Sequence, residues 1–104
     1  QVNFQEALLQ ASNLEKADLR HGDLWRVDLR WSNLKSADLR NAYLREAVLR
    51  DTELQGADLR ETKLQGADLR EANLEGTRLQ GAEADRRTRW PAGFEATGVR
   101  LVDD

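Results

Sequence analysis

The stretch ADLRNAYLREAVLRDTELQGADLR runs from Ala37 to Arg60 and places leucine at every fifth position: Leu39, Leu44, Leu49, Leu54 and Leu59. A helix keeps residues on one face with steps of three and four, and a strand does so with steps of two. On a helix, five residues advance by about 500°, so successive leucines would drift by about 140° around the cylinder. On a straight strand, an odd step would send alternate leucines to opposite faces. The spacing therefore excludes both a helix and a straight strand.

The same register holds far beyond this stretch. The centre of each five-residue unit is Phe4, then leucine at every fifth position from Leu9 to Leu79, and finally Ala84. The residue two places before each centre is small, most often alanine, serine or threonine. Two residues spaced in this way point to the same side of a short extended segment, and the three polar residues that follow must turn the chain. The pattern predicts a solenoid with the leucines inside.

The turn positions carry a second signal. Four glycines lie two residues after a centre, at the third position of a four-residue turn: Gly56, Gly66, Gly76 and Gly81. A type II turn needs a positive φ at this position, which glycine adopts freely and which Asn41 can also adopt. Earlier units carry Glu6, Lys16, Arg26 or Glu46 there. We therefore expect those earlier turns to be of another type.

The spacing of the arginines predicts the number of residues in one coil. It follows the centre of every second unit, at Arg20, Arg30, Arg40, Arg50, Arg60 and Arg70. Four units per coil would place these residues in two straight columns on opposite faces, whereas three units would scatter them. Asp18, Asp38 and Asp58 agree, because they are spaced by twenty residues. The sequence predicts a square coil of twenty residues.

Several units resemble the pentapeptide-repeat family, whose motif is A(D/N)LXX. The literal matches are Ala17-Asp18-Leu19, Ala37-Asp38-Leu39, Ala57-Asp58-Leu59, Ala67-Asp68-Leu69 and Ala72-Asn73-Leu74. The resemblance covers residues 1 to 86 and is specific for fold, because the units follow one another without an insertion. It implies an all-β protein, a right-handed quadrilateral parallel β-helix of about four coils of twenty residues.

We expect two segments, the β-helix over residues 1–86 and a C-terminal cap or tail over residues 87–104. The tail contains Trp90, Pro91 and Phe94, and we expect the two aromatic residues to form a lid over Leu79 and Ala84. A similar tail closes some pentapeptide-repeat proteins, while ligand stacking on Trp90 is the alternative. The N-terminal coil shows no such segment, so Phe4, an upstream domain or a second copy of the chain in a homodimer would cover it. Because the sequence opens at Gln1 and already in the repeat, we interpret it as a mature form or a fragment.

Composition narrows the functional classes. The net charge of -3 does not favour a nucleic-acid partner. No apolar run has the length of a membrane span or a targeting segment, so we expect no membrane partner. The sequence leaves the cellular compartment open. The chain has no cysteine and one histidine, His21, which we interpret as an exposed turn residue. We expect no catalytic residues, no metal site and no cofactor. Inward hydroxyls are predicted to bond to the backbone, at Ser12, Ser32, Thr52, Thr62 and Thr77.

One surface patch is a candidate for protein interaction. Outward apolar and aromatic residues occur in the early units, with arginines beside them: Leu8, Trp25, Trp31, Tyr43 and Val48, then Arg26, Arg30 and Arg50. Tryptophan and arginine are enriched at interface hot spots, and exposed apolar patches usually mark a partner. Tryptophans lying over their neighbouring turns, and a site that stacks a sugar or a base, are the alternatives. The arginine columns are interpreted as salt-bridged walls, with binding of an anionic partner as their alternative.

These features favour a non-enzymatic structural or protein-interaction module, a rigid scaffold that presents the patch to a protein partner. The alternative comes from the family: some pentapeptide-repeat proteins resemble a DNA duplex in shape and charge and inhibit or protect type II topoisomerases such as gyrase. The short array, the small net charge with two arginine columns, and the absence of an obvious apolar dimerisation helix argue against that alternative.

Overall fold

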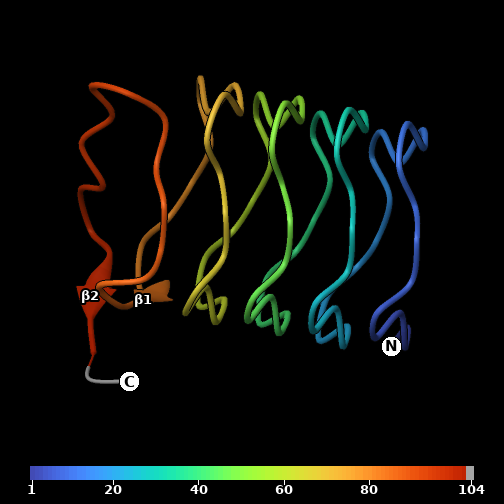
Figure 1. Ribbon diagram of the computed structural model, residues 1–104, viewed down its shortest axis with the longest axis horizontal. Helices are drawn as coiled ribbons and strands as arrows, with labels where there is room; N and C mark the ends of the chain where they lie inside the picture. The colour runs from blue at the N-terminus through green and yellow to red at the C-terminus, as the bar shows by residue number, and fades with distance from the viewer. Residues whose placement is uncertain (103–104) are drawn as a thin grey trace.

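The five-residue repeat closes one coil every twenty residues. In the computed structural model, which describes residues 1–102, parallel bridges join Asn3 to Asp23, Asp23 to Tyr43, and Tyr43 to Lys63. Within the repeat the same step of twenty holds on the other three sides, as in the series Asp18, Asp38 and Asp58, and the last bridge, from Asp68 to Arg89, has one residue more. Successive coils therefore stack in a column with the two chain ends at opposite ends of it (Figure 1). The chain forms a quadrilateral parallel β-helix, as the sequence predicts.

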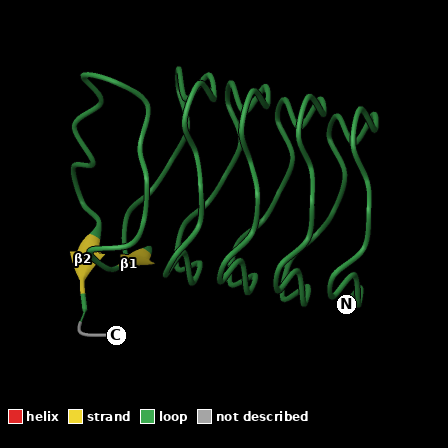
Figure 2. Ribbon diagram, in the orientation of Figure 1, coloured by secondary structure: helices red, strands yellow, loops and turns green. Residues whose placement is uncertain are grey.

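We name the four sides of the column by the leucines of one coil. The Leu24 face, the Leu29 face, the Leu34 face and the Leu39 face each contain the equivalent residues of the other coils, at steps of twenty. Because three residues of every five turn the chain, nearly all contacts between coils are single-residue bridges. The described residues contain two named strands, β1 (Glu83–Ala84) and β2 (Arg100–Leu101). They pair in parallel, with Glu83 opposite Arg100 (Figure 2).

The prediction that the early turns differ from the glycine turns is wrong. Glu6, Lys16, Arg26 and Glu46 have φ values of 58°, 61°, 56° and 57°, close to the 70° of Gly56. These five turns are also closed by the same hydrogen bond, in which the fourth residue donates its N–H to the carbonyl of the first, as Ala7 does to Phe4 at 3.0 Å.

Stacking between coils explains why these residues accept a left-handed conformation. The N–H group of Glu6 donates to the carbonyl of Trp25 in the next coil at 2.8 Å, and Ser36 does the same to Gln55 at 3.0 Å. This conformation costs a residue with a Cβ atom about 1–2 kcal/mol. A different turn would leave the N–H group and the carbonyl unpaired between stacked coils, which is a comparable or larger loss. The hydrogen bond between coils therefore determines the conformation of the turn, and residues other than glycine adopt it in spite of its cost.

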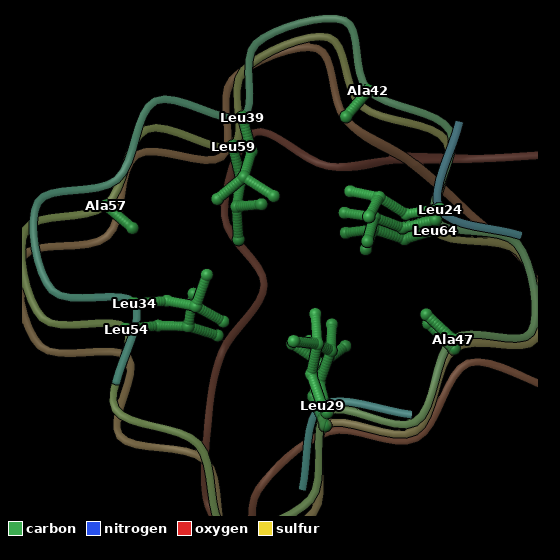
Figure 3. Packing of buried hydrophobic residues seen from close by; sticks show 14 of the residues in the cluster. Leu24, Leu29, Leu34, Leu39, Ala42, Ala47, Leu54, Ala57, Leu59 and Leu64 are labelled. Atoms are coloured by element: carbon green, nitrogen blue, oxygen red, sulfur yellow. The ribbon is translucent and has the colours of Figure 1, made fainter. Parts of the chain in front are cut away.

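The leucines fill the interior. From Leu24 to Leu69 every central leucine is almost completely buried, and side chains from the four faces meet in stacked layers (Figure 3). Four of the five inward hydroxyls donate to backbone carbonyls as predicted, for example Ser32 to Leu9 at 2.9 Å and Thr62 to Leu59 at 2.8 Å, with Thr52 and Thr77 doing the same. For the hydroxyl of Ser12 the bond stays a prediction. A close-packed leucine core and hydrogen-bonded hydroxyls favour an ordered column.

The two ends of the column differ. At the N-terminal end the centres Phe4, Leu9 and Leu14 are only partly buried, and they pack against the core from one side. At the C-terminal end Trp90 and Phe94 stack with their ring centroids 5.5 Å apart and also pack against the core. The role of these two residues as a cap stays a prediction, and the last two residues of the predicted segment 87–104 lie outside the described range.

Candidate functional site

Aspartate and arginine form a repeated clasp on two opposite faces. On the Leu29 face, Arg30 donates from Nε and Nη2 to the two carboxylate oxygens of Asp28, at 2.9 and 2.7 Å. The same bidentate contact recurs in four other pairs: Asp18–Arg20, Asp38–Arg40, Asp58–Arg60 and Asp68–Arg70. The hydrogen bonds from Arg30 hold the pKa of the Asp28 carboxyl below its usual value. In each of the other four pairs, the arginine lowers the pKa of its own aspartate in the same way. These pairs form the salt-bridged walls that the sequence predicts.

Arg50 is the exception in this series. The position that aspartate occupies in the clasped pairs is Val48 here, so Arg50 has no carboxylate two residues before it with which to form a clasp. Among residues 1–102 its side chain makes no hydrogen bond or ion pair, and its buried Nε has no acceptor. Its charge contributes to the low pKa of the Asp68 carboxyl in the next coil, without a contact within 4 Å. Arg50 is thus a half-buried cation that forms no ion pair within the described residues.

The Leu29 face brings together five of the predicted patch residues. Leu8 and Val48 both bridge to Asp28, so they lie in one line, one coil apart on either side of it. At the corner that follows this face, Trp31 is 59% exposed and the Arg30 guanidinium lies 5.2 Å from its ring centroid. Arg50 lies one coil beyond Arg30 in the same column. We call these five residues, Leu8, Arg30, Trp31, Val48 and Arg50, the Leu29-face patch.

The other three predicted residues lie at the corner before this face and on the Leu24 face. Trp25 is half-buried under the guanidinium of Arg26, which lies 5.3 Å from its ring centroid and pairs with Glu6 at 3.7 Å. Tyr43 is 50% exposed and is bridged on the Leu24 face by Asp23 and Lys63. The predicted residues therefore form two adjoining groups around one corner of the column.

The Leu24-face group contains a hollow that the sequence reasoning missed. Trp25 and Tyr43 line an open depression of about 390 Å³ together with Gln5, Asp23 and Arg45. The sequence could have placed Gln5 and Arg45 beside Trp25, because the three residues are spaced by twenty and so occupy the same position in successive coils. Arg45 makes no ion pair in the described part of the chain, so it adds a second unneutralised cation beside the aromatic residues.

The histidine and the possible metal ligands give no further candidate site in the described residues. His21 is an exposed turn residue with a φ of 59°, as predicted. In the described part of the chain, no three histidine, cysteine, aspartate or glutamate side chains are grouped so that they could hold a metal ion. Within residues 1–102 no helix has the length and hydropathy of a membrane span.

Comparison with known proteins identifies the repeat. The family model described as pentapeptide repeats matches residues 1–35, 12–51, 28–66 and 52–86, with 8 copies of the repeat. No curated protein sequence matches the chain.

Three solved structures are similar. The pentapeptide repeat protein Rfr23 from the cyanobacterium Cyanothece 51142 is 35% identical over 85% of this chain, with a TM-score of 0.77, and this chain covers 63% of its length. A pentapeptide repeat protein from Nostoc PCC 7120 is 37% identical over 96% of this chain and 80% of its own, with a TM-score of 0.53. QnrB1, a plasmid-mediated fluoroquinolone resistance protein, has a TM-score of 0.63 at 20% identity over 97% of this chain and 65% of its own, which shows a shared fold alone. The chain belongs to the pentapeptide-repeat family, and its fold is the right-handed quadrilateral β-helix.

Proposed function

We propose that the chain is a non-enzymatic interaction module that presents the Leu29-face patch and the neighbouring Trp25–Tyr43 hollow to a protein partner. The observation that carries this proposal is Arg50, whose guanidinium pairs with no carboxylate among residues 1–102, while the equivalent arginines on the same face are clasped. A partner carboxylate placed beside Arg50 would supply the contact that Val48 cannot.

The surroundings of Arg50 support a protein as the partner. Trp31 is 59% exposed, and its N–H group donates to the carbonyl of Arg50, so a large apolar side chain lies in the coil next to the unpaired charge. Leu8, which is 76% exposed, lies on the same face one coil further away. A hydrophobic centre with arginine and tryptophan is the usual composition of an interface hot spot. The rigid coil also limits the entropy lost on binding, because the backbone is already ordered. We infer a partner surface with an acidic residue next to an apolar pocket.

Variants of the purified protein test this proposal. The native protein, the Trp25, Trp31, Tyr43 triple alanine variant and Arg50→Glu are compared as baits in a lysate of the source organism. We expect a specific partner to be retained by the native protein and lost from both variants. Arg20→Glu is the matched control with the same change of charge, because Arg20 is clasped by Asp18 on the opposite face, and this variant is expected to retain the partner. Equal retention by all four baits would contradict the proposal.

The alternative function, a DNA-like inhibitor or protector of gyrase, requires a continuous acidic face. The aspartate column of the Leu39 face is the best candidate for one, yet Arg20, Arg40 and Arg60 clasp its three members. The likeness to QnrB1 adds a shared fold and no further argument for this function. A supercoiling assay separates the two functions: inhibition of gyrase at stoichiometric protein concentration would favour the alternative.

We also propose association of two copies through the N-terminal end of the column. Phe4, Leu9 and Leu14 are partly exposed there, and the outer N–H groups of Leu8 and Asn13 have no partner within residues 1–102. Sedimentation velocity should then show a dimer that Phe4→Asp converts to a monomer. A native protein that is monomeric at high concentration would contradict this association.

A further inference from the structure

The C-terminal tail completes only part of the next coil. On the Leu24 face, the N–H group of Glu83 donates to the carbonyl of Thr62 at 2.9 Å. On the Leu29 face, the N–H group of Leu69 donates to the carbonyl of Arg89 at 2.7 Å. The next segment of the stack is thus supplied on the Leu24 face by the end of the repeat, at Glu83, and on the Leu29 face by the tail, at Arg89. On the Leu34 face no segment follows Ala72–Leu74 in the described chain.

The missing segment leaves two backbone groups without partners. One coil earlier, the N–H group of Leu54 donates to the carbonyl of Asn73, and the carbonyl of Thr52 accepts from the N–H group of Asn73, both at 3.0 Å. The equivalent N–H group of Leu74 and carbonyl of Ala72 have no such bond within residues 1–102. Leu74 is also 7% exposed, whereas Leu54 is fully buried. The Leu34 face therefore ends in an open strand edge.

A hollow lies along this edge. Residues Glu71–Glu75 form one wall and residues Pro91–Phe94 form the other, around a volume of about 560 Å³. The aromatic ring of Phe94 supplies an apolar side to the hollow, and Trp90 holds that ring by stacking. The space and the open edge together match what an additional extended segment requires.

The charge of the rim indicates which segment would fit. Glu71 and Glu75 stand at the two ends of the Ala72–Leu74 edge, and both are exposed without an ion pair in the described part of the chain. On the same face one coil earlier, Glu53 is neutralised by Lys35 at 3.1 Å. Two unneutralised carboxylates beside an open strand edge favour lysine or arginine in the incoming segment.

We propose that this hollow binds an extended, lysine- or arginine-bearing peptide segment of a partner protein, which adds as the next strand of the Leu34 face. Its backbone donates an N–H group to the carbonyl of Ala72 and accepts from the N–H group of Leu74, as Asn73 does with the coil before it. Its basic side chains pair with Glu71 and Glu75, and an apolar side chain packs on Phe94. This site is independent of the Leu29-face patch, which lies on another side of the column and in the early coils.

A labelled pentapeptide of alternating lysine and valine, acetylated and amidated at its ends, tests the proposal by fluorescence anisotropy. We expect Glu75→Lys to weaken its binding at least tenfold. Glu15→Lys is the matched control, because Glu15 occupies the same column of the same face in the first coil and the charge change is identical. We expect that variant to bind as the native protein does. Equal weakening by both variants would show attraction to the net charge only and would overturn the proposal.

The backbone contacts need a separate readout. The same peptide methylated on its backbone nitrogens keeps its charge and loses its donors, so we expect no measurable binding. In the native protein, amide hydrogen exchange at Leu74 should be fast without peptide and at least tenfold slower with it. Equal binding of the methylated peptide would overturn the proposal. So would a Leu74 amide that is already protected in the free protein, because the chain's own tail or a second copy would then occupy the edge.

Discussion

Replacement of Leu44 by alanine tests the inward register of the whole array. Leu44 is fully buried, and the bridges from Tyr43 to Asp23 and Lys63 place it between Leu24 and Leu64 in one stack. Removal of the branched end of the side chain forfeits about 2 kcal/mol of transfer free energy. The cavity adds to this loss because neighbouring coils are locked by hydrogen bonds and cannot collapse, so we expect a total of about 3–4 kcal/mol. That is a large share of the roughly 5–15 kcal/mol that stabilises a domain.

Urea unfolding followed by circular dichroism measures this loss by linear extrapolation. Leu9→Ala is the control, because Leu9 has the same place in its unit but is only partly buried in the first coil. We expect that variant to lose about 1–2 kcal/mol, in proportion to its smaller buried area. Leu44→Asp, which would place a charge in the core, should prevent folding. Equal losses for Leu44→Ala and Leu9→Ala, or a Leu44→Asp variant that melts like the native protein, would refute the reasoning.

Three further predictions concern acid stability, turns and inward hydroxyls. The clasped aspartates have pKa values below that of a free carboxyl. Their stabilisation is therefore complete above the unfolded pKa of about 4 and is lost as the pH falls through the folded values; a urea midpoint that does not change between pH 6 and pH 2 would contradict this. Ser36→Gly should raise the free energy of unfolding by about 0.5–1 kcal/mol, since Ser36 has a φ of 57°. Gly56→Ala in the same column should lower it by about 1 kcal/mol, and the same sign of change in both would argue against turn strain. Thr62→Val should lower stability by about 1 kcal/mol, because it removes the 2.8 Å bond to the carbonyl of Leu59 without a change of shape; an unchanged urea midpoint would count against that bond.

The clasps bear on function because they leave few charges free. An exposed aspartate–arginine pair contributes little to stability by itself, yet it neutralises both groups toward a partner. On the Leu29 face the clasps at Asp28 and Asp68 lie on either side of Val48, so Arg50 is the arginine of that column left without a clasp in the described chain. Under the proposed function, the specificity of this surface would come from the position where the repeat departs from its pattern, at Val48, rather than from the regular units around it.

The sequence by itself determined the fold. A strict period of five allows neither a helix nor a straight strand, and the twenty-residue spacing of Asp18, Asp38 and Asp58 gave the same coil that their bridges show. The inward hydroxyls also followed from the sequence, because a position two residues before a buried leucine must face the core. Arg50 and Val48 were among the patch residues predicted from the sequence, and the absence of an aspartate two residues before Arg50 could also have been read from the regular series.

Only the tertiary structure decided the conformation of the early turns and the site at the end of the column. The left-handed φ of Glu6 follows from a hydrogen bond to the carbonyl of Trp25, nineteen positions away, and local residue preference cannot reveal it. The hollow beside Leu74 depends on the path of the tail, in which Trp90 and Phe94 stack where a regular coil would have continued. The tail has no repeat, so its path is set by packing against the finished column, and the sequence period contains no information about it.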